Sequence, residues 1–367
     1  MSAPDTKKTP LAEVHEDLGA TVTEFAGYLM PLRYGSETAE HQAVRTSAGL
    51  FDLSHMGEIF VTGTQAGAAL DHALIGHLSA LAVGRARYTM ICDPQGGVLD
   101  DLIVYRLAAE TFLVVANASN AALVHSELVK RSDGFEGATV DDRSDAYALV
   151  AVQGPKAQAI LSKLTDAPVA DLKYYAGLPG AVAGIDALIA RTGYTGEDGF
   201  ELFVPASDAV TVWEALTEAG GDELRPCGLS ARDTLRLEAG MPLYGNELTT
   251  ATTPYDAGLG RTIKFDKGDF VGRAALAALA DETPERTLIG LVAKGRRVPR
   301  HGYEIVGSDG TPCGVVTSGA PSPTLGKPIA MGYIDAGHTE DTDLYVDIRG
   351  KNEPVDKVAL PFYRRTP

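Results

Sequence analysis

The sequence has few cysteines and no metal-binding spacing. Cys92, Cys227 and Cys313 lie far apart and form no Cys-x-x-Cys pair, which excludes a disulfide framework or a zinc knuckle. We expect each to be a small core residue. The eight histidines form neither HExxH nor HxH, and His55 stands alone among apolar neighbours in FDLSHMGEI, so a satisfied structural role is the expectation. No metal site is predicted.

Positive charge and long apolar runs are also scarce. The chain has 32 basic and 49 acidic residues and a formal net charge of −17, and its longest basic cluster is the short KGRR at residues 294–297. Such a chain repels phosphate backbones, so we do not expect it to bind DNA or RNA. No apolar run approaches the roughly 20 residues of a membrane helix, and the first residues lack the apolar core of a secretion signal. We therefore expect a cytoplasmic protein without membrane contact.

Nucleotide-binding motifs are missing as well. Neither GxxxxGK[ST] nor a strand-linked GxGxxG is found, which argues against bound nucleotide or flavin. What the chain does have is the 45% hydrophobic and 22% charged composition of a soluble globular protein, and 367 residues suggest two or three domains.

Short segments that alternate apolar and polar residues recur along the chain and predict strands, mostly at hairpin spacing. They are EIFVTG, YTMIC, VLDDLIVYR, TFLVVAN, YALVAVQG, GFELFVP, LIGLVAK and YEIVGS. Between them, helical patterns occur in GTQAGAALDHALIGHL, GPKAQAILSKLT and SDAVTVWEALTEAG, the last with a Ser-Asp cap signal. This mixture predicts an α+β fold with antiparallel sheets.

A domain boundary is predicted near residues 281–287. The helical segment FVGRAALAAL is followed by the charged, proline-containing ADETPERT. Beyond it, glycine and proline punctuate short strands, as expected for a small β-barrel or sandwich from about Thr287 to the end. We therefore expect one region over residues 1–280 and a C-terminal barrel over residues 287–367.

The stretch GGVLDDLIVYR places two adjacent carboxylates, Asp100 and Asp101, in an apolar strand. Asp100 shares a face with Val98, Leu102 and Val104, whereas Asp101 shares the other with Leu99, Ile103 and Tyr105. Both faces are apolar, so the alternation does not show which of the two aspartates is functional. A salt bridge or a turn cap is the alternative to a functional role, because an unpaired buried carboxylate is costly.

The surrounding sequence predicts a three-stranded meander. A first turn centred on Gln95 brings Tyr88 and Thr89 opposite Asp101, give or take a residue, and a second centred on Ala109 brings Asn117 opposite it. Tyr88, Asp101 and Asn117 would then form one polar row across neighbouring strands.

The motifs FAGYLMPL, FDLSHMGE, GGVLDDLIVYR, VQGP, RTGYTGEDGFEL, GLSARDTLRLEAGMPLYGNEL and KGDFVG occur in this order. Together they resemble the aminomethyltransferase family of the glycine cleavage system, the T-proteins, from near Thr9 to Tyr363. The resemblance implies a three-domain cloverleaf around a central folate channel, with two intertwined α/β domains and a C-terminal barrel. It also implies transfer of an aminomethyl group from the lipoyl arm of H-protein to tetrahydrofolate, giving 5,10-methylenetetrahydrofolate, ammonia and dihydrolipoyl H-protein.

The resemblance also implies site residues. The functional aspartate of GGxxDD matches Asp101, beside the reactive N5/N10 side of folate, and leaves Asp100 as a structural neighbour. The family's folate-binding positions match Met56, Tyr88, Asp101, Asn117, Tyr175, Tyr194, Glu201 and Arg232. The chain departs from the family in having Tyr28 where Trp is frequent and Leu53 where Val is usual. Neither change removes a polar group.

The chemistry of a folate suits these residue types. One carboxylate can accept the adjacent N3–H and 2-amino donors of a pterin, for which Glu201 is the candidate. Tyr175 and Tyr194 would supply flat apolar walls, with core packing as the alternative for each. Gly193, Gly196 and Gly199 are expected to permit a tight turn. Asp101 would orient folate, stabilise the developing cationic carbon and, as an open option, shuttle a proton.

Three other functions are weighed against this one. A folate-binding relative that assists iron–sulfur assembly carries KGCYxGQE, where this chain has FDKGDFVGRAAL. The folate-handling half of a demethylating oxidase for methylated glycines would need a fused flavin domain or a separate flavoprotein. A passive folate carrier stays open. For H-protein docking, KGRRVPRHG at residues 294–302 is a candidate, against the alternative of a merely solvated face.

Overall fold

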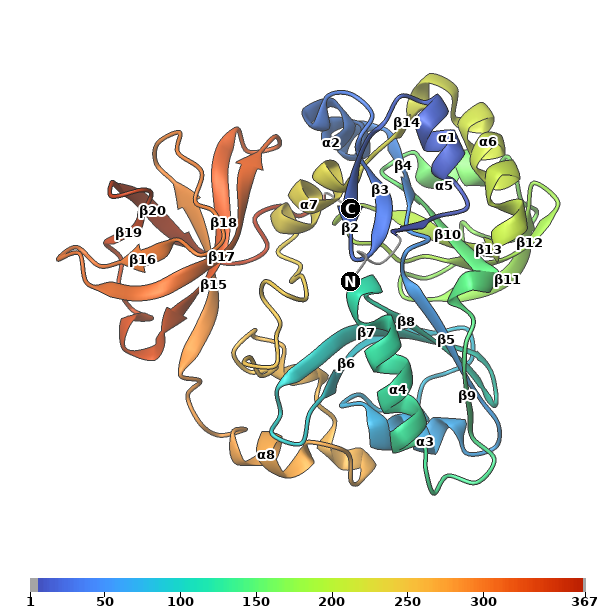
Figure 1. The fold of residues 1–367 in the computed structure, drawn as a ribbon, viewed down its shortest axis with the longest axis horizontal. Coiled ribbons are helices and arrows are strands. Elements are labelled where there is room, and N and C mark those ends of the chain that lie inside the picture. Colours follow the sequence, from blue (N-terminus) through green and yellow to red (C-terminus); the bar gives the residue numbers. More distant parts are fainter. Residues whose placement is uncertain (1–5, 366–367) are drawn as a thin grey trace. The chain divides into compact units, whose positions relative to one another are not determined.

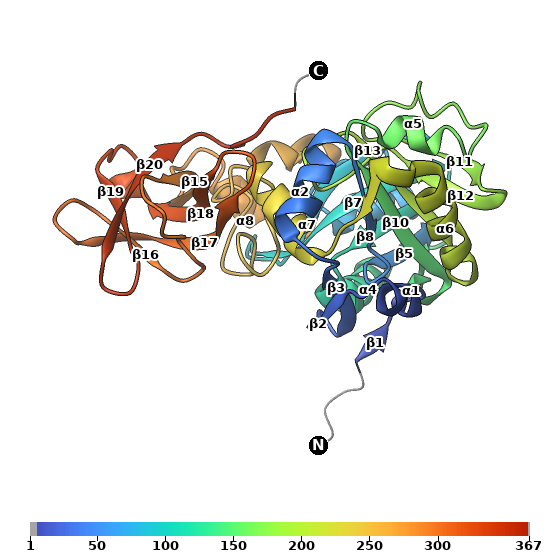
Figure 2. The same cartoon turned by 90° about the horizontal axis from the view of Figure 1, so that it is seen from above.

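The computed structural model describes residues 6–365, which divide by their internal contacts into two compact units. The first unit comprises the residues up to Ala73, His77–Tyr88 and Leu102–Arg232, and the second comprises Leu74–Gly76, Thr89–Asp101 and the residues from Asp233 on. Figures 1 and 2 show the elements of both units in two views.

The first unit contains a six-stranded sheet whose neighbouring strands are antiparallel except for one parallel pair at its edge, β14 with β4. In spatial order its strands are β11 (Gly177–Val182), β12 (Ile185–Ala190), β13 (Gly199–Pro205), β10 (Tyr147–Gln153), β4 (Ala48–Asp52) and β14 (Leu224–Pro226). One face packs on helices α5 (Ala157–Leu161) and α6 (Ala209–Gly220), where the buried Trp213 lies. The even-numbered residues of β10 and β13 fill this core because side chains alternate along a strand.

A five-stranded sheet has the order β6 (Ala86–Cys92), β7 (Val98–Ala108), β8 (Thr111–Ala116), β5 (Gly57–Thr62) and β9 (Thr139–Asp142). Helices α3 (Ala66–Ala73) and α4 (Ala121–Arg131) pack together and against its strands. The β7–β8 ladder pairs Ile103 with Val115 and Arg106 with Phe112, so the midpoint is residue 109, as the sequence predicts.

In the first unit, the faces of these two sheets that point away from the helices look toward one another. The hydroxyl of Tyr105 on β7 reaches Glu201 of β13, and its ring packs edge-on against Phe203 at 5.7 Å between centroids. The odd-numbered residues of β10 and β13 and the even-numbered residues of β12 thus meet the odd-numbered residues of β7 and β8 and the even-numbered residues of β5. Side chains of both sheets therefore line the space between them.

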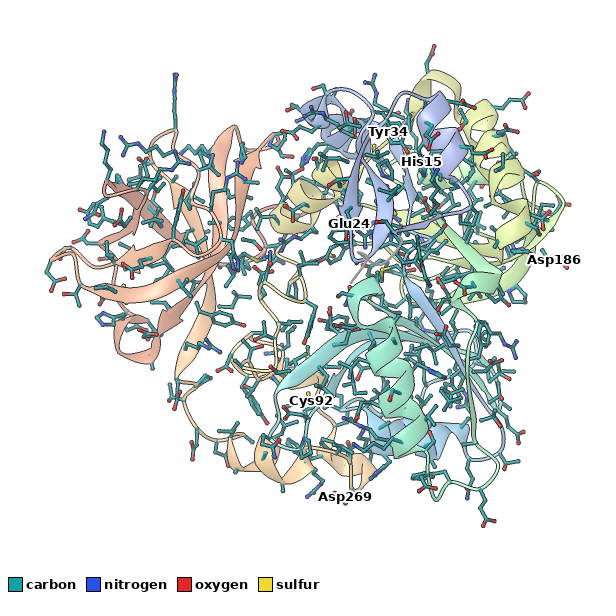
Figure 3. All side chains as sticks on the ribbon, viewed as in Figure 1. His15, Glu24, Tyr34, Cys92, Asp186 and Asp269 are labelled. Atoms are coloured by element: carbon teal, nitrogen blue, oxygen red, sulfur yellow. The ribbon has the colours of Figure 1, made fainter. Side chains whose placement is uncertain are left out.

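The N-terminal segment is attached to the six-stranded sheet by a buried polar chain. Strands β1 (Lys7–Lys8), β3 (Tyr28–Arg33) and β2 (Thr21–Phe25) form a small sheet, and helices α1 (Ala12–Asp17) and α2 (Glu37–Thr46) complete the segment. Asp52 accepts hydrogen bonds from Thr9 at 2.7 Å and from the ring of His15 at 2.9 Å, and the other ring nitrogen of His15 lies 2.8 Å from the Tyr34 hydroxyl (Figure 3). Burial raises the pKa of Tyr34, so this hydroxyl is no activated nucleophile.

The second unit contains a closed six-stranded barrel. Around it run β15 (Arg286–Ala293), β18 (Lys327–Asp335), β17 (Pro312–Ser322), β16 (Glu304–Val306), β19 (Leu344–Asp347) and β20 (Asn352–Val358), each antiparallel to its neighbours. Helix α7 (Leu229–Glu238) continues from the first unit into this one, and α8 (Arg273–Ala278) precedes the barrel. Short 3-10 turns are η1 (Ala118–Asn120), η2 (Ser144–Ala146), η3 (Ala206–Asp208), η4 (Gly221–Glu223), η5 (Gly260–Thr262), η6 (Phe265–Lys267) and η7 (Ala336–His338).

A buried ion pair attaches α7 to the barrel within the second unit. Arg236, 1% exposed, donates to Glu247 at 3.0 Å and to the hydroxyl of Ser318 on β17 at 2.7 Å. Two residues further along, Glu238 accepts hydrogen bonds from Ser322 and from Thr324. The second half of the ARDTLRLEAG motif thus stabilises the packing of α7 on the barrel.

The predicted α+β class, antiparallel sheets and C-terminal barrel are confirmed. The division into residues 1–280 and 287–367 stays a prediction. All three cysteines are buried and free, as expected of core residues. In the described part of the chain, no helix is both long and apolar enough to cross a membrane.

Candidate functional site

A buried carboxylate lies at the centre of a polar cluster in the first unit. Glu201 on β13 is 9% exposed and accepts hydrogen bonds from Thr192 at 2.5 Å and Tyr105 at 3.4 Å. The Tyr105 hydroxyl is also 2.7 Å from that of Thr192. Burial raises the pKa of Glu201, while the Thr192 hydrogen bond and the charge of Arg232 oppose the rise. A ligand that donates hydrogen bonds to this carboxylate would favour its ionised form.

Arg232 and Tyr194 stand beside this carboxylate. The guanidinium of Arg232, in the first turns of α7, lies 4.9 Å from the centroid of the Tyr194 ring, within the range of a cation–π contact. Both side chains are partly exposed. The structure therefore brings three of the predicted residues, Tyr194, Glu201 and Arg232, into one cluster.

The GYTGEDG loop beside the cluster owes its shape to the side chain of Gln153. A Cβ on Gly193 would lie 2.0 Å from Oε1 of Gln153, and one on Gly199 would lie 2.5 Å from its Nε2. Gln153 donates to the carbonyl of Thr192 at 3.0 Å and accepts from Thr195 at 2.9 Å. Of the three glycines, only Gly196 has the positive φ, +80°, that a tight turn requires. The turn explanation therefore holds for Gly196, whereas Gly193 and Gly199 leave room for Gln153.

The acidic residues of this loop pair with two arginines. Arg45 on α2 donates to the carbonyl of Thr195 at 2.7 Å and to the carboxylate of Glu197 at 2.9 Å. Arg191 makes a two-pronged contact to Asp198, at 2.9 and 2.5 Å. Such bidentate pairs fix orientation as well as distance. The loop that carries Tyr194 is therefore held from both sides.

The buried His55 lies within electrostatic range of Arg232. It is 3% exposed, and its ring stands edge-on to Phe25 and Tyr28. Burial and the nearby charge of Arg232 lower its pKa to about 4. Among residues 6–365 its Nδ1 has no hydrogen-bond partner, so the expectation of a fully satisfied structural histidine is wrong for this atom.

Tyr175 has an unusual backbone. Its φ of +57° lies in the left-handed region, which non-glycine residues rarely adopt and which is enriched at functional sites. Its N–H donates to the carbonyl of Arg191 and its own carbonyl accepts from Ala86. Its phenol is close enough to raise the pKa of Tyr105, whose main cause is burial. Tyr175 therefore lies beside the Glu201 cluster.

Three further candidates in the first unit occupy strand ends and turns. Tyr88 lies within β6, Asn117 directly follows β8, and Met56 lies in the turn before β5 with its N–H donating to Leu53. All three side chains are partly exposed. Their assignment as ligand residues stays a prediction.

The two aspartates of GGVLDDLIVYR differ in exposure. Asp100 is 0% exposed, whereas Asp101 is partly exposed. The turn before them has the predicted centre, because the N–H of Asp93 donates to Gly97 across Gln95. Both aspartates lie near Tyr244 in the same unit, where burial and their charges raise the pKa of its phenol. Of the pair, only Asp101 has appreciable solvent-exposed surface, and its assignment as a site residue stays a prediction.

The basic cluster at residues 294–297 is exposed on the barrel. Lys294 pairs with Asp356 at 3.0 Å, and Arg297 lies 4.0 Å from Glu353. These pairs offset part of the positive charge. Its use as a docking surface stays a prediction.

Sequence reasoning missed Tyr105, Thr192 and Gln153, and it gave His55 no place in the site. Tyr105 lies two strand positions from Ile103 on the face shared with Asp101, and Thr192 directly precedes the Gly-Tyr pair of the loop. The only signal for Gln153 was the VQGP motif. Nothing in the spacing showed that its side chain fills the space beside two glycines.

The comparisons with known proteins agree with one another. The family model described as the GCVT N-terminal domain matches residues 11–267, and the glycine cleavage T-protein C-terminal barrel domain matches residues 286–364. Aminomethyltransferases of Streptomyces avermitilis and Saccharopolyspora erythraea are 64% and 62% identical to this chain, with 100% of each chain covered. The crystal structure of glycine cleavage system aminomethyltransferase T from Bartonella henselae matches with a TM-score of 0.92 at 38% identity, covering 98% of both chains. The chain therefore belongs to the T-protein family of glycine cleavage system aminomethyltransferases.

Proposed function

We propose that this aminomethyltransferase of the glycine cleavage system uses tetrahydrofolate as its acceptor and lipoylated H-protein as its donor. The sulfur-bound aminomethyl carbon leaves the lipoyl arm, and the products are 5,10-methylenetetrahydrofolate, ammonia and dihydrolipoyl H-protein. The observation that carries the proposal is the cluster in which the buried Glu201 is held by Thr192 beside the Arg232–Tyr194 stack.

The cluster has the chemistry that a pterin requires. Glu201 would accept the N3–H and 2-amino donors together, which favours its ionised form and offsets the cost of burying it. The rings of Tyr175 and Tyr194 would cover the flat faces of the folate. Arg232 would keep the carboxylate charged and supply donors of its own. Met56, Tyr88 and Asn117 complete the proposed folate-binding set.

Asp101 is proposed as the catalytic residue. Breaking the carbon–sulfur bond leaves the electron pair on sulfur and makes an iminium carbon, which N5 of folate attacks. N10 then closes the ring as ammonia leaves with its electron pair, and the N–H protons of N5 and N10 pass overall to the thiolate and to the departing amine. A carboxylate near N10 stabilises the positive charge that develops and orients the attacking nitrogen. Asp101 suits this role better than Asp100, because Asp100 is fully buried.

A single-turnover assay with aminomethyl-lipoyl H-protein and tetrahydrofolate tests the proposal. Ammonia and methylenetetrahydrofolate should form together and only when both substrates are present. Asp101→Asn should lower the rate about 10²- to 10⁴-fold, the usual contribution of a positioned acid or base, while folate affinity measured separately changes little. Asp100→Asn is the matched control and should affect mainly stability.

Two results would contradict these assignments. Folate binding without folate-dependent release of ammonia would make the chain a passive folate carrier. A larger loss of turnover in Asp100→Asn than in Asp101→Asn would reverse the choice between the two carboxylates.

A further inference from the structure

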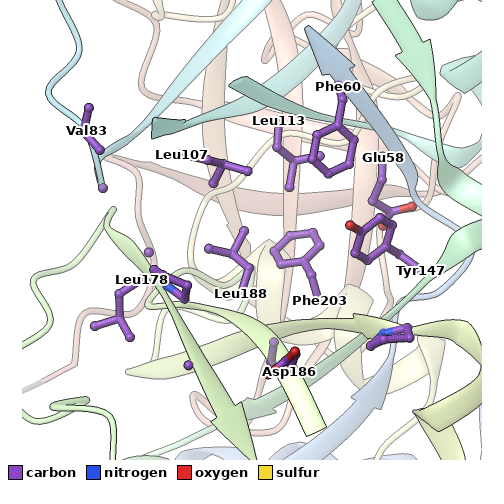
Figure 4. Close-up of a pocket in the computed structure, with 16 residues that line it drawn as sticks. Glu58, Phe60, Val83, Leu107, Leu113, Tyr147, Leu178, Asp186, Leu188 and Phe203 are labelled. Carbon is purple, nitrogen blue, oxygen red and sulfur yellow. The ribbon is translucent and has the colours of Figure 1, made fainter. Parts of the chain in front are cut away.

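The first unit contains a large pocket that none of the proposed folate-binding residues lines. Its volume is 820 Å³, within the range of about 300–1,000 Å³ typical of small-molecule sites. Strands of both sheets supply its walls, and Figure 4 shows Glu58, Phe60 and Tyr147 at one side with Val83 and Leu178 opposite.

Glu58 is the only described acid that is both fully buried and part of this lining. Its side chain is 1% exposed on β5, and neither carboxyl oxygen has a hydrogen-bond partner among residues 6–365. Its backbone is fully engaged, since its N–H donates to Ser144 and its carbonyl accepts from Arg143. An unpartnered buried carboxyl is costly in a purely structural role and indicates a place for a hydrogen-bonding ligand.

Aromatic and aliphatic side chains form the rest of the walls. The rings of Phe60 and Tyr147 stack with centroids 5.6 Å apart, and Phe203 and Leu188, which pair across β13 and β12, continue the wall beside Tyr147 (Figure 4). The face of Phe60 already attracts one cation, because the guanidinium of Arg143 lies 4.8 Å from its centroid. Such walls suit an apolar ligand body and tolerate a positive charge beside it.

The charged residues that line the pocket favour a positively charged ligand. Of the described lining residues, Glu58 and Asp186 are acidic and none is basic. Asp142 on β9 is near enough to raise the pKa of Glu58 further, beyond the rise caused by burial. A cation would restore the charged form of Glu58, whereas an anion such as the glutamate tail of a folate would gain no favourable charge from this lining.

We propose that this pocket binds a small organic amine, with its ammonium group on the Glu58 carboxylate and its apolar body against Phe60, Tyr147 and Phe203. The pocket shares no lining residue with the Glu201 cluster, although Phe203 packs against Tyr105, and the proposal does not depend on the proposed function. Binding of a cationic amine to a protonated Glu58 releases one proton. The other ionisable groups around Glu58 and the pocket are Asp142, Arg143, Tyr147 and Asp186.

The test compares two probes of nearly equal shape, 2-phenylethylamine and 2-phenylethanol, by saturation-transfer NMR with the full chain at pH 7.5. The amine should bind at least about tenfold more tightly than the alcohol, which corresponds to one charge-assisted hydrogen bond. Glu58→Gln should remove this difference while binding of the alcohol persists. Calorimetry in buffers of different ionisation enthalpy should show proton release by wild type and none by Glu58→Gln.

Two controls separate binding from folding and from the folate site. Leu178→Trp fills the far side of the pocket and should weaken both probes, although it leaves Glu58 intact. The far-ultraviolet circular dichroism spectrum and the rate of aminomethyl transfer should be unchanged in both variants. Equal affinities for amine and alcohol, an unaltered amine affinity in Glu58→Gln, or competition by tetrahydrofolate would each overturn the proposal.

Discussion

Acidification should destabilise the first unit through His55, because the folded chain holds this ring in its neutral form. The unfolded chain protonates the ring near pH 6.5, whereas burial and Arg232 lower the folded pKa to about 4. The stabilisation is therefore complete above pH 6.5 and is lost as the pH falls toward 4. Each pKa unit corresponds to about 1.36 kcal/mol, so between pH 7.5 and pH 4.5 the loss from this one group is about 2.5 kcal/mol.

The assay is urea unfolding of wild type and His55→Gln at these two pH values, followed by fluorescence. The single tryptophan, Trp213, is buried in the same unit as His55 and reports its unfolding. Ionisable groups distant from His55 are shared by both chains, so their contributions cancel in the difference. Wild type should lose about 2.5 kcal/mol more than the variant.

A matched variant, His301→Gln, alters an exposed histidine of the second unit and controls for the loss of a histidine as such. If His55→Gln and wild type lost the same free energy of unfolding between the two pH values, the neutral state assigned to His55 would be wrong.

Three further predictions concern buried polar contacts. Arg236→Met should lower the free energy of unfolding, measured by calorimetry, by about 3–5 kcal/mol, because it leaves the Glu247 charge buried without a partner. Adding Glu247→Leu should recover much of this loss. Equal melting temperatures of the single and double variants would contradict the prediction. Gly193→Ala should lower the free energy of unfolding, measured with urea, by about 1–3 kcal/mol, because its Cβ crowds Gln153. Adding Gln153→Ala should recover part of this loss. Thr192→Val should weaken tetrahydrofolate binding several-fold in a fluorescence titration while Thr192→Ser does not; no change would argue against the folate assignment.

The strand meander was predictable because its local signals are strong. DPQGG contains an aspartate that caps its own turn, with Asp93 accepting from the N–H groups of Gln95 and Gly97. The alternation of VLDDLIVYR then fixed the two faces of β7. Turn chemistry and period-two alternation act over a few residues, so one sequence suffices to read them.

The choice between Asp100 and Asp101 could not be made from the same pattern. Both strand faces are apolar, and what distinguishes them is the exposure that tertiary packing gives each one. Helix boundaries were also imprecise. The helical pattern at residues 63–78 is longer than the helix it predicts, α3, which spans Ala66–Ala73. The Ser-Asp cap signal at residues 207–208 lies in the 3-10 turn η3, and α6 begins after it at Ala209.

The Glu201 cluster was predictable in part. Tyr194, Glu201 and Arg232 were found through family motifs, whereas the hydroxyls that orient Glu201 belong to residues with no distinctive spacing. Gln153 and Thr192 are 39 residues apart in the sequence, and their contact depends on the pairing of β10 with β13. Such long-range contacts are set by sheet topology, which local patterns do not encode.

The burial of all three native thiols has a practical consequence for spectroscopy. Cys92, Cys227 and Cys313 are each at most 1% exposed, and burial raises the pKa of Cys227 well above its usual range. Since the thiolate is the form that reacts with maleimides and nitroxide reagents, native labelling should be slow. One cysteine introduced on the surface would then be the fast-reacting thiol, so site-specific fluorophores or spin labels can be attached without first removing the natural cysteines.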